Sequence, residues 1–220
     1  AFIDVDNDGW LDLYACNIDG PNQLFMNQGN GSFLEEAETR GVQFTGATTM
    51  CSFADYDRDG DLDLYLVNNR ILSILEEQPV IKIRKVGGRP TVHPDFAEQY
   101  FLLDGRVQEA GQKDCLYRND GKGNFVDVTD AAGIAGFDMG LSASWWDYDG
   151  DGWMDLYVAN DLKSPDRFYK NQKDGTFKDV ISETVTHTPW FSMGADSADI
   201  NNDGKLDFLV ADMSSTTHYK

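Results

Sequence analysis

The chain has 220 residues, of which 41% are hydrophobic and 12% aromatic, which is enough to bury a core and excludes a disordered polypeptide. Its 38 Asp and Glu against 18 Lys and Arg give a formal net charge of −20, which argues against nucleic acid or an anionic membrane as partner and favours cations. No apolar run is long enough to span a membrane. The three cysteines, Cys16, Cys51 and Cys115, allow at most one disulfide and are expected to be small buried residues.

An aspartate-rich segment occurs four times along the chain. The copies are "FIDVDNDGWLDLY" from Phe2, "FADYDRDGDLDLY" from Phe53, "WWDYDGDGWMDLY" from Trp145 and "SADINNDGKLDFL" from Ser197. A second motif follows three of them: "LFMNQGNGSF" at 24–33, "LYRNDGKGNF" at 116–125 and "FYKNQKDGTF" at 168–177. The spacing of about 52 residues predicts a structural repeat, because self-similarity at a fixed period is typical of repeat architectures.

Each repeat is predicted to consist of strands. "LDLYLVN" alternates leucines with other side chains, the period-2 pattern of a β-strand, and "LYRN" and "FVDV" flank a turn cluster as in a hairpin. Stretches rich in small residues precede the aspartate segments, as suits a strand near a crowded axis. Four strands in about 52 residues predict an all-β fold of four-stranded antiparallel β-propeller blades.

The repeat units are expected to form one propeller region over 1–220, with bounds 1–44, 45–134, 135–185 and 186–220. The first unit begins within its first strand and the last stops after its second, so the chain holds about three and a half blades. We expect it to be part of a larger propeller whose targeting sequence lies upstream; alternatively, the open strand edges pair with neighbouring copies. An insertion at 70–113 in the second unit carries the basic cluster "KIRKVGGR". It is either a recognition arm or subunit contact, or a lid on its own blade.

The aspartate segments have the composition of cation-binding loops. Counting from the first aspartate, acidic residues occupy positions 1, 3, 5 and 9, with an asparagine at position 3 of the fourth loop, and glycine occupies position 6. Two unit charges about 4 Å apart repel by about 4 kcal/mol at an effective dielectric constant near 20. Only Arg58 and Lys205 supply positive charge within the loops, so the protein's own cations are expected not to balance them.

A hard divalent cation would relieve this repulsion, and calcium accepts six to eight oxygen ligands in flexible geometry. The pattern is not an EF-hand, because position 12 is apolar (Ala15, Leu66, Val158 and Val210) where an EF-hand requires glutamate. We predict up to four calcium ions, which would reduce the net charge from −20 to −12, with the fourth site weaker because Asn201 replaces an aspartate. Position 7 is expected to contribute its backbone carbonyl. The predicted ligands are Asp4, Asp6, Asp8, Trp10 and Asp12; Asp55, Asp57, Asp59, Asp61 and Asp63; Asp147, Asp149, Asp151, Trp153 and Asp155; and Asp199, Asn201, Asp203, Lys205 and Asp207.

The motifs "DVDNDGWLDLY", "DYDRDGDLDLY", "DYDGDGWMDLY" and "DINNDGKLDF" resemble the FG-GAP/VCBS repeats of integrin-α-like propellers. The nearest look-alikes are ASPIC/UnbV-type proteins and the related cartilage acidic proteins. The resemblance implies a secreted or surface-exposed propeller, seven blades in total, and structural calcium in the loops between the first and second strands of each blade. It also implies that ligands meet the opposite face, where the insertion would lie.

We expect a calcium-stabilised extracellular module for binding or adhesion, not an enzyme, with a protein or carbohydrate ligand. One alternative is a subunit of a surface array or filament that self-associates through its strand edges. Another is a polysaccharide-acting enzyme, with Tyr100, Arg89 and His93 as first candidates. Trp145 and Trp146 are expected to pack between blades rather than to bind sugar. The isolated histidines do not indicate a zinc site.

Overall fold

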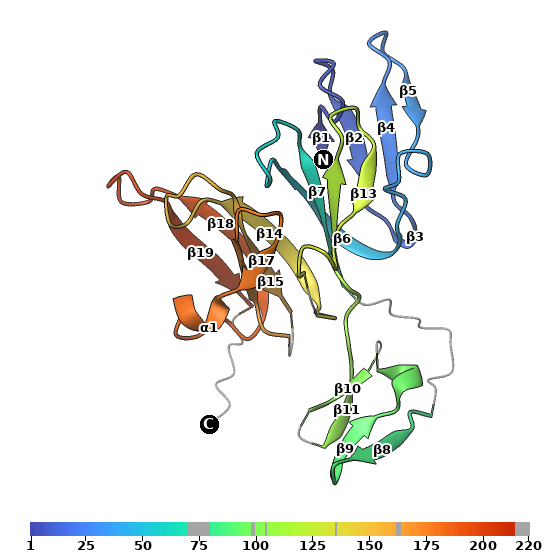
Figure 1. The fold of residues 1–220 in the computed structure, drawn as a ribbon, viewed down its shortest axis with the longest axis vertical. Helices are drawn as coiled ribbons and strands as arrows, with labels where there is room; N and C mark the ends of the chain where they lie inside the picture. The colour runs from blue at the N-terminus through green and yellow to red at the C-terminus, as the bar shows by residue number, and fades with distance from the viewer. Residues whose placement is uncertain (70–79, 98–99, 104, 135, 162–163, 214–220) are drawn as a thin grey trace.

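The computed structural model describes residues 1–69, 80–97, 100–103, 105–134, 136–161 and 164–213, and its regular structure is almost entirely antiparallel strand (Figure 1). The first sheet contains, in spatial order, β1 (Phe2–Ile3), β2 (Asp12–Ala15), β4 (Gln23–Asn27) and β5 (Phe33–Glu35). The second contains β13 (Phe125–Asp127), β12 (Cys115–Asn119), β7 (Asp63–Asn68), β6 (Thr45–Ala54) and β3 (Ile18–Pro21). The third contains β14 (Gly140–Trp146), β15 (Asp155–Asn160), β16 (Arg167–Asn171) and β17 (Phe177–Asp179), and the fourth β18 (Ser192–Ala198) and β19 (Asp207–Asp212).

The predicted all-β blade architecture is therefore confirmed. In each of the first three sheets, a strand before the aspartate segment pairs with the strand after it, which in turn pairs with a hairpin. The hairpins close in the same register, with Asn27 opposite Phe33, Asn119 opposite Phe125 and Asn171 opposite Phe177. We refer to the four sheets as blades A to D in chain order.

The strands rich in small residues form the contacts between blades. Strand β14 packs against both β6 and β18. Thr49 of β6 donates a hydrogen bond from Oγ1 to the Gly140 carbonyl at 3.0 Å, and Ser144 of β14 donates to the Ala195 carbonyl at 2.6 Å. A Cβ on Gly140 would lie 2.4 Å from Cγ1 of Val67, so only glycine permits this approach of blade C to blade B.

Two elements were not predicted from the sequence. Strand β3 leaves blade A and pairs with β6 of blade B, with Ile18 opposite Ala47 and Pro21 opposite Thr45. Pro21 is tolerated there because an edge strand does not need every backbone N–H. A short helix, α1 (Ile181–Thr184), follows β17.

Aromatic side chains fill the spaces between blades, as predicted for Trp145 and Trp146. The Trp146 ring is buried and stacks on Phe208 of blade D, with ring centroids 4.4 Å apart and an interplanar angle of 13°. Trp145 contacts Tyr56 and Tyr65 of blade B, at centroid distances of 6.4 Å and 6.2 Å. Cys115 is buried, Cys16 and Cys51 are half-buried against the core of blades A and B, and all three are free thiols.

The insertion forms a separate lobe, drawn in green at the bottom of Figure 1. It contains a hairpin of β8 (Ile83–Val86) and β9 (Arg89–Val92), a 3-10 turn η1 (Pro94–Phe96), and a hairpin of β10 (Tyr100–Leu103) and β11 (Arg106–Glu109). The lobe leaves blade B at the end of β7 opposite the aspartate loop, because it connects β7 to β12. Its stem is closed by a hydrogen bond of 2.9 Å from the Gln112 backbone N–H to the Asn69 carbonyl.

Candidate metal centres

The four aspartate loops share one hydrogen-bonded frame. In each, the aspartate at position 1 accepts a hydrogen bond from the backbone N–H of the glycine at position 6, at 2.9, 3.2, 2.7 and 2.9 Å in chain order. These glycines are Gly9, Gly60, Gly152 and Gly204, with φ between 83° and 95°. This left-handed conformation disfavours other residues, so position 6 bends the loop back onto its first carboxylate.

The aspartate at position 9 joins the loop to the rest of its blade. Asp63 is fully buried; its Oδ2 accepts from the Tyr56 N–H at 3.3 Å and its Oδ1 from the Asn119 N–H at 2.8 Å. Asp12 and Asp155 make the equivalent pair of bonds in blades A and C. Position 9 therefore anchors the loop to the third strand, a structural role beyond the ligand role predicted for it.

In three loops the carboxylates converge on a common point. One oxygen from each of three aspartates lies within 4.8 Å of the others in three groups: Asp4, Asp6 and Asp8; Asp55, Asp57 and Asp63; Asp147, Asp149 and Asp155. Among the described residues, the fourth loop contains no such group. This loop has an asparagine at position 3 in place of an aspartate. The structure thus brings together the predicted ligands at positions 1 and 3 in each of the first three loops, joined by position 5 or position 9.

Three of these carboxylates have a buried oxygen with no hydrogen-bond donor in the part of the chain that the structure describes. Oδ1 of Asp6, Oδ1 of Asp55 and Oδ1 of Asp57 are buried without a hydrogen-bond donor. An unsatisfied buried carboxylate oxygen is costly, and several in one small volume are more so because their charges repel. An oxygen-preferring cation in each of the first two loops would satisfy these oxygens, so the residues present fit calcium.

Burial and repulsion between carboxylates also shift the pKa values of the aspartates in the loops. Burial raises the pKa of Asp63 to about 8 and that of Asp155 to about 6, and neighbouring carboxylates add to the effect. Burial also raises the pKa values of Asp6, Asp12 and Asp57. Each carboxylate would therefore be favoured in its charged form by a positive ion within the loop.

In blade C the structure adds two cations to the loop that the expectation of positive charge from Arg58 and Lys205 alone did not include. Lys170, on β16, forms an ion pair with Asp149, and Lys173, in the β16–β17 turn, forms one of 2.9 Å with Asp151. The sequence placed these lysines outside the loop, and only the antiparallel return of β16 brings them beside it. A cation in this loop would have to compete with two ammonium groups.

Three asparagines that were not predicted as site residues hold the aspartate loops, and two of them also reach the loop of the preceding blade. The amide nitrogens of Asn27, Asn119 and Asn171 donate to the backbone carbonyl of the residue at position 8 of their own blade's loop. Asn119 also donates to the Val5 carbonyl in blade A at 2.8 Å, and Asn171 to the Tyr56 carbonyl in blade B at 2.8 Å. The recurring Asn in "LFMN", "LYRN" and "FYKN" was the available signal.

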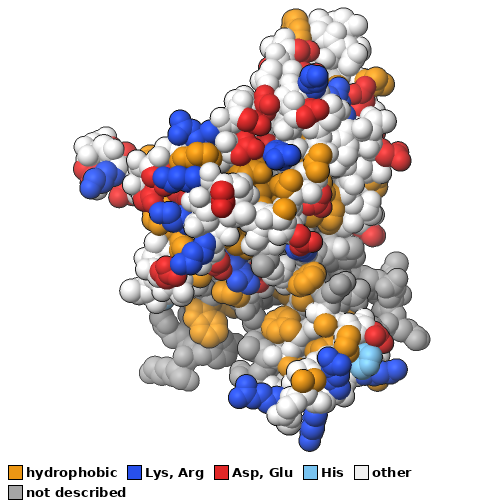
Figure 2. All heavy atoms as spheres, in the orientation of Figure 1, with side chains coloured by type: hydrophobic (Ala, Val, Ile, Leu, Met, Phe, Trp, Pro, Cys, Tyr) orange, Lys and Arg blue, Asp and Glu red, His pale blue; other side chains and the backbone are white. Residues whose placement is uncertain are grey.

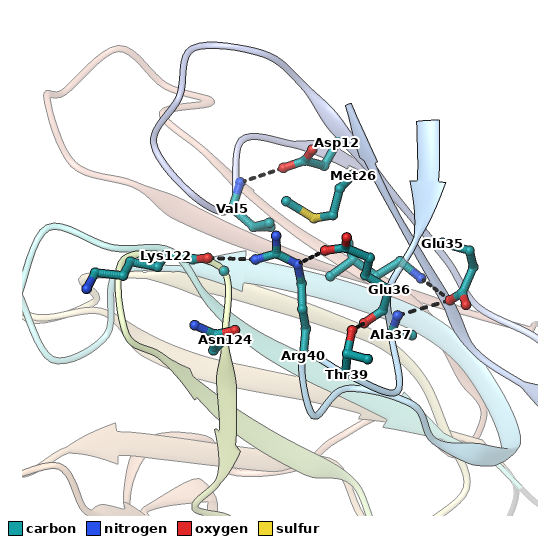
Figure 3. Close-up of polar contacts among 12 residues, drawn as sticks. Val5, Asp12, Met26, Glu35, Glu36, Ala37, Thr39, Arg40, Lys122 and Asn124 are labelled. Carbon is teal, nitrogen blue, oxygen red and sulfur yellow. Dashed lines mark hydrogen bonds and ion pairs between the residues drawn. The ribbon is translucent and has the colours of Figure 1, made fainter. Parts of the chain in front are cut away.

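Arg40 supports the first loop from the side (Figure 3). Its guanidinium donates to Glu36 at 2.6 Å and to the Lys122 carbonyl of blade B at 2.6 Å. It lies close enough to Asp6 to oppose, in part, the rise in the pKa of that carboxyl. Arg40 therefore holds blades A and B together beside the first carboxylate group.

Other predicted residues remain predictions. Position 7 of the loops, whose backbone carbonyls were predicted as ligands, is occupied by Trp10, Asp61, Trp153 and Lys205. The Asp61 side chain accepts a hydrogen bond from Asn7 of the neighbouring loop at 2.8 Å.

In the insertion, His93 accepts a hydrogen bond from the Asp95 N–H at 3.4 Å. Within the described ranges, no hydrogen bond or ion pair joins Arg89, His93 and Tyr100. None of the described helices has the length and hydrophobicity needed to cross a membrane.

The FG-GAP-like repeat profile matches residues 4–66, 105–158 and 147–210, which is most of the chain. The chain belongs to the FG-GAP-like repeat family. The matched segments contain all four aspartate loops, and the gap between them contains the β8–β9 hairpin.

This FG-GAP-like chain is also similar to cartilage acidic protein 1. It is 24% identical to the mouse protein over 170 residues, covering 68% of this chain and 26% of that protein. The Xenopus tropicalis protein is 23% identical, covering 71% and 27%, and the human protein 22% identical, covering 68% and 26%. The chain thus spans about a quarter of the length of these relatives. The chain also aligns with the solved structure of an Agrocybe aegerita lectin that recognises non-reducing terminal N-acetylglucosamine. The alignment covers 94% of this chain and 59% of the lectin chain, with 17% sequence identity and a TM-score of 0.29.

Proposed function

We propose that this chain is a calcium-binding segment of an extracellular FG-GAP propeller that serves in binding or adhesion and does not itself catalyse a reaction. The observation that carries the proposal is the set of buried, unsatisfied carboxylate oxygens in the first two loops. Similarity to cartilage acidic protein 1 supports the extracellular placement. Extracellular calcium modules bind with dissociation constants of about 0.1–1 mM, within reach of calcium outside cells.

Calcium has a structural role in this proposal. The loops are tied to the third strands through Asp12, Asp63 and Asp155, and to neighbouring blades through Asn119 and Asn171. A cation in one loop therefore stabilises a blade and its contact with the next. Blades A and B are expected to bind more tightly than blade C, where Lys170 and Lys173 compete, and than blade D, which has one fewer carboxylate.

The proposal is tested by thermal unfolding of the chain in about 5 mM calcium and in excess chelator. This calcium concentration exceeds the expected dissociation constant several-fold. We expect calcium to raise the melting temperature, because a ligand that binds only the native state stabilises it by mass action. Asp57→Asn should reduce the shift, since it removes a charged ligand from the second loop. Asp19→Asn, at an exposed position on β3, is the matched control and should leave the shift unchanged.

An equal melting temperature in calcium and chelator would contradict the metal role of the loops. Equal shifts in Asp57→Asn and Asp19→Asn would place the bound calcium elsewhere. The binding or adhesion role is tested separately, by whether the calcium-loaded chain attaches to immobilised extracellular matrix and loses attachment in chelator.

A further inference from the structure

The β8–β9 hairpin presents a row of cations on one of its faces. Alternation along β8 places Arg84 and Val86 on the same side, and Lys82 continues the pattern one residue before the strand, where its carbonyl accepts from the His93 N–H at 2.9 Å. The register pairs Val86 with Arg89 and Arg84 with Thr91, and directly paired residues share a face, so Arg89 joins this side. Lys82, Arg84 and Arg89 are all exposed. Figure 2 shows Lys and Arg side chains gathered on this lobe, at the bottom of the view.

These three cations have no carboxylate partner among the described residues, where none of them forms an ion pair. On the opposite face of the hairpin Val92 is buried, and β9 packs against β10, whereas Ile83 and Lys85 on that face are exposed. At the end of the hairpin where Val92 lies, the cationic face therefore points away from the lobe's own contacts. Over 70–113 the sequence has seven basic and six acidic residues, so the insertion as a whole is nearly neutral. The positive charge on the hairpin is therefore a local concentration of basic residues.

The strongly acidic blades do not cancel this local positive potential. The aspartate loop of blade B lies at the far end of β7, and a six-residue strand is about 20 Å long. At physiological ionic strength the Debye length is about 8 Å, so charges at that separation are largely screened. A polyanion approaching the lobe would respond mainly to the hairpin.

We propose that this face of the hairpin, formed by Lys82, Arg84 and Arg89, binds a sulfated polysaccharide. Residues two apart on a strand are separated by about 7 Å, so the cations form a short row suited to a chain with repeated charges rather than to a single small anion. Guanidinium groups bind oxyanions through two parallel hydrogen bonds, which favours Arg84 and Arg89 as the sulfate contacts.

A folded acidic protein fits this face less well. Stable protein interfaces bury about 1,200–2,000 Å² around an apolar centre, whereas this face offers Val86 and Thr91 between three charged side chains. A linear polyanion needs only the row of charges, because release of its counterions supplies much of the binding free energy. The inference rests on the proposed extracellular binding role and names the partner and surface that the role would use.

The test is titration of the whole chain in calcium with heparin as the sulfated probe, at several salt concentrations. The triple variant Lys82→Ser, Arg84→Ser and Arg89→Ser should weaken binding by roughly tenfold or more and flatten its salt dependence. The matched control removes three exposed cations from the blades: Arg118→Ser, Lys122→Ser and Lys178→Ser. It should bind heparin like the unmodified chain.

Equal loss in the two triple variants, or no heparin binding by the unmodified chain, would overturn the proposal. So would equally tight binding of hyaluronan, which is anionic but unsulfated, or tighter binding of phosphatidylserine vesicles. Calcium-dependent melting of the same variants is the separate check. A hairpin variant that loses heparin but keeps its calcium shift supports both proposals, whereas loss of the calcium shift in the unmodified chain would overturn the metal proposal alone.

Discussion

Asn119, on β12, joins the aspartate loop of blade B to that of blade A. Its amide donates to the Leu62 carbonyl at 3.1 Å and the Val5 carbonyl at 2.8 Å, and its side-chain oxygen accepts from the Gly121 and Gly123 N–H groups. Asn27, at the same place in blade A, makes the bond within its own blade, to Leu11.

Asn119→Ala should therefore destabilise the chain by about 2 kcal/mol more than Asn27→Ala, since it leaves an additional buried carbonyl unsatisfied. Denaturant unfolding in saturating calcium measures the difference. Equal costs for the two variants would mean that the bond between blades contributes nothing to stability.

Asp114, which lies outside the aspartate loops, is expected to make the stability of the fold depend on pH. It is half-buried and accepts from the Tyr65 hydroxyl at 2.8 Å and the Asn68 N–H at 2.7 Å, and burial raises its pKa to about 7. Because the folded-state pKa lies above the ordinary value of 3.8, the native state holds this proton more tightly than the unfolded chain. Its stabilising contribution is complete below about pH 4 and is lost as pH rises towards about 7.

Asp114→Asn should remove that contribution, leaving a smaller decrease in stability between about pH 5 and pH 8 than in the unmodified chain. Asparagine already stands at the corresponding place in blade A, where Asn22 is buried and accepts from the Asn17 N–H. Melting temperatures across this pH range in saturating calcium test the prediction. An unchanged pH profile would show that Asp114 is ionised in the native state throughout.

At the scale of the strand, aromatic stacking joins blade C to blade D. Trp146 on β14 lies between Phe168 of its own blade and Phe208 of β19, with centroid distances of 5.1 Å and 4.4 Å. Trp146→Ala should cost about 3–5 kcal/mol, the usual range for removing a large buried aromatic side chain.

Trp190→Ala is the control for Trp146, because this indole is 78% exposed and its removal should change stability by less than about 0.5 kcal/mol. Calorimetric or denaturant unfolding of the two variants measures both. Similar effects would mean that β18 and β19 are not held by the packing described here.

At the scale of the whole molecule, the insertion is attached to blade B at a narrow stem. The Asn69 carbonyl and the Gln112 N–H are 2.9 Å apart, and the Gln112 side chain accepts from the Ala47 N–H at 2.6 Å. The two ends therefore meet closely enough for a short turn to replace the lobe.

Replacing residues 70–111 with a short Asn-Gly turn that retains Gln112 should leave the calcium shift of the blades intact and abolish heparin binding. Thermal unfolding and heparin titration of the same protein measure the two outcomes. Loss of folding or of the calcium shift would show that the lobe supports blade B, which corresponds to the alternative of a lid on its own blade.

The sequence by itself determined the repeat, the strand content and the composition of the loops, because each depends on local spacing: alternation within a strand, glycine at position 6, and carboxylates at fixed intervals. Only the tertiary structure decided which groups meet across strands and blades. The ion pairs of Lys170 and Lys173, the pairing of β3 with β6, and the bonds from Asn119 and Asn171 to preceding loops join residues distant in sequence. Such contacts depend on the packing of whole sheets, so no single repeat encodes them.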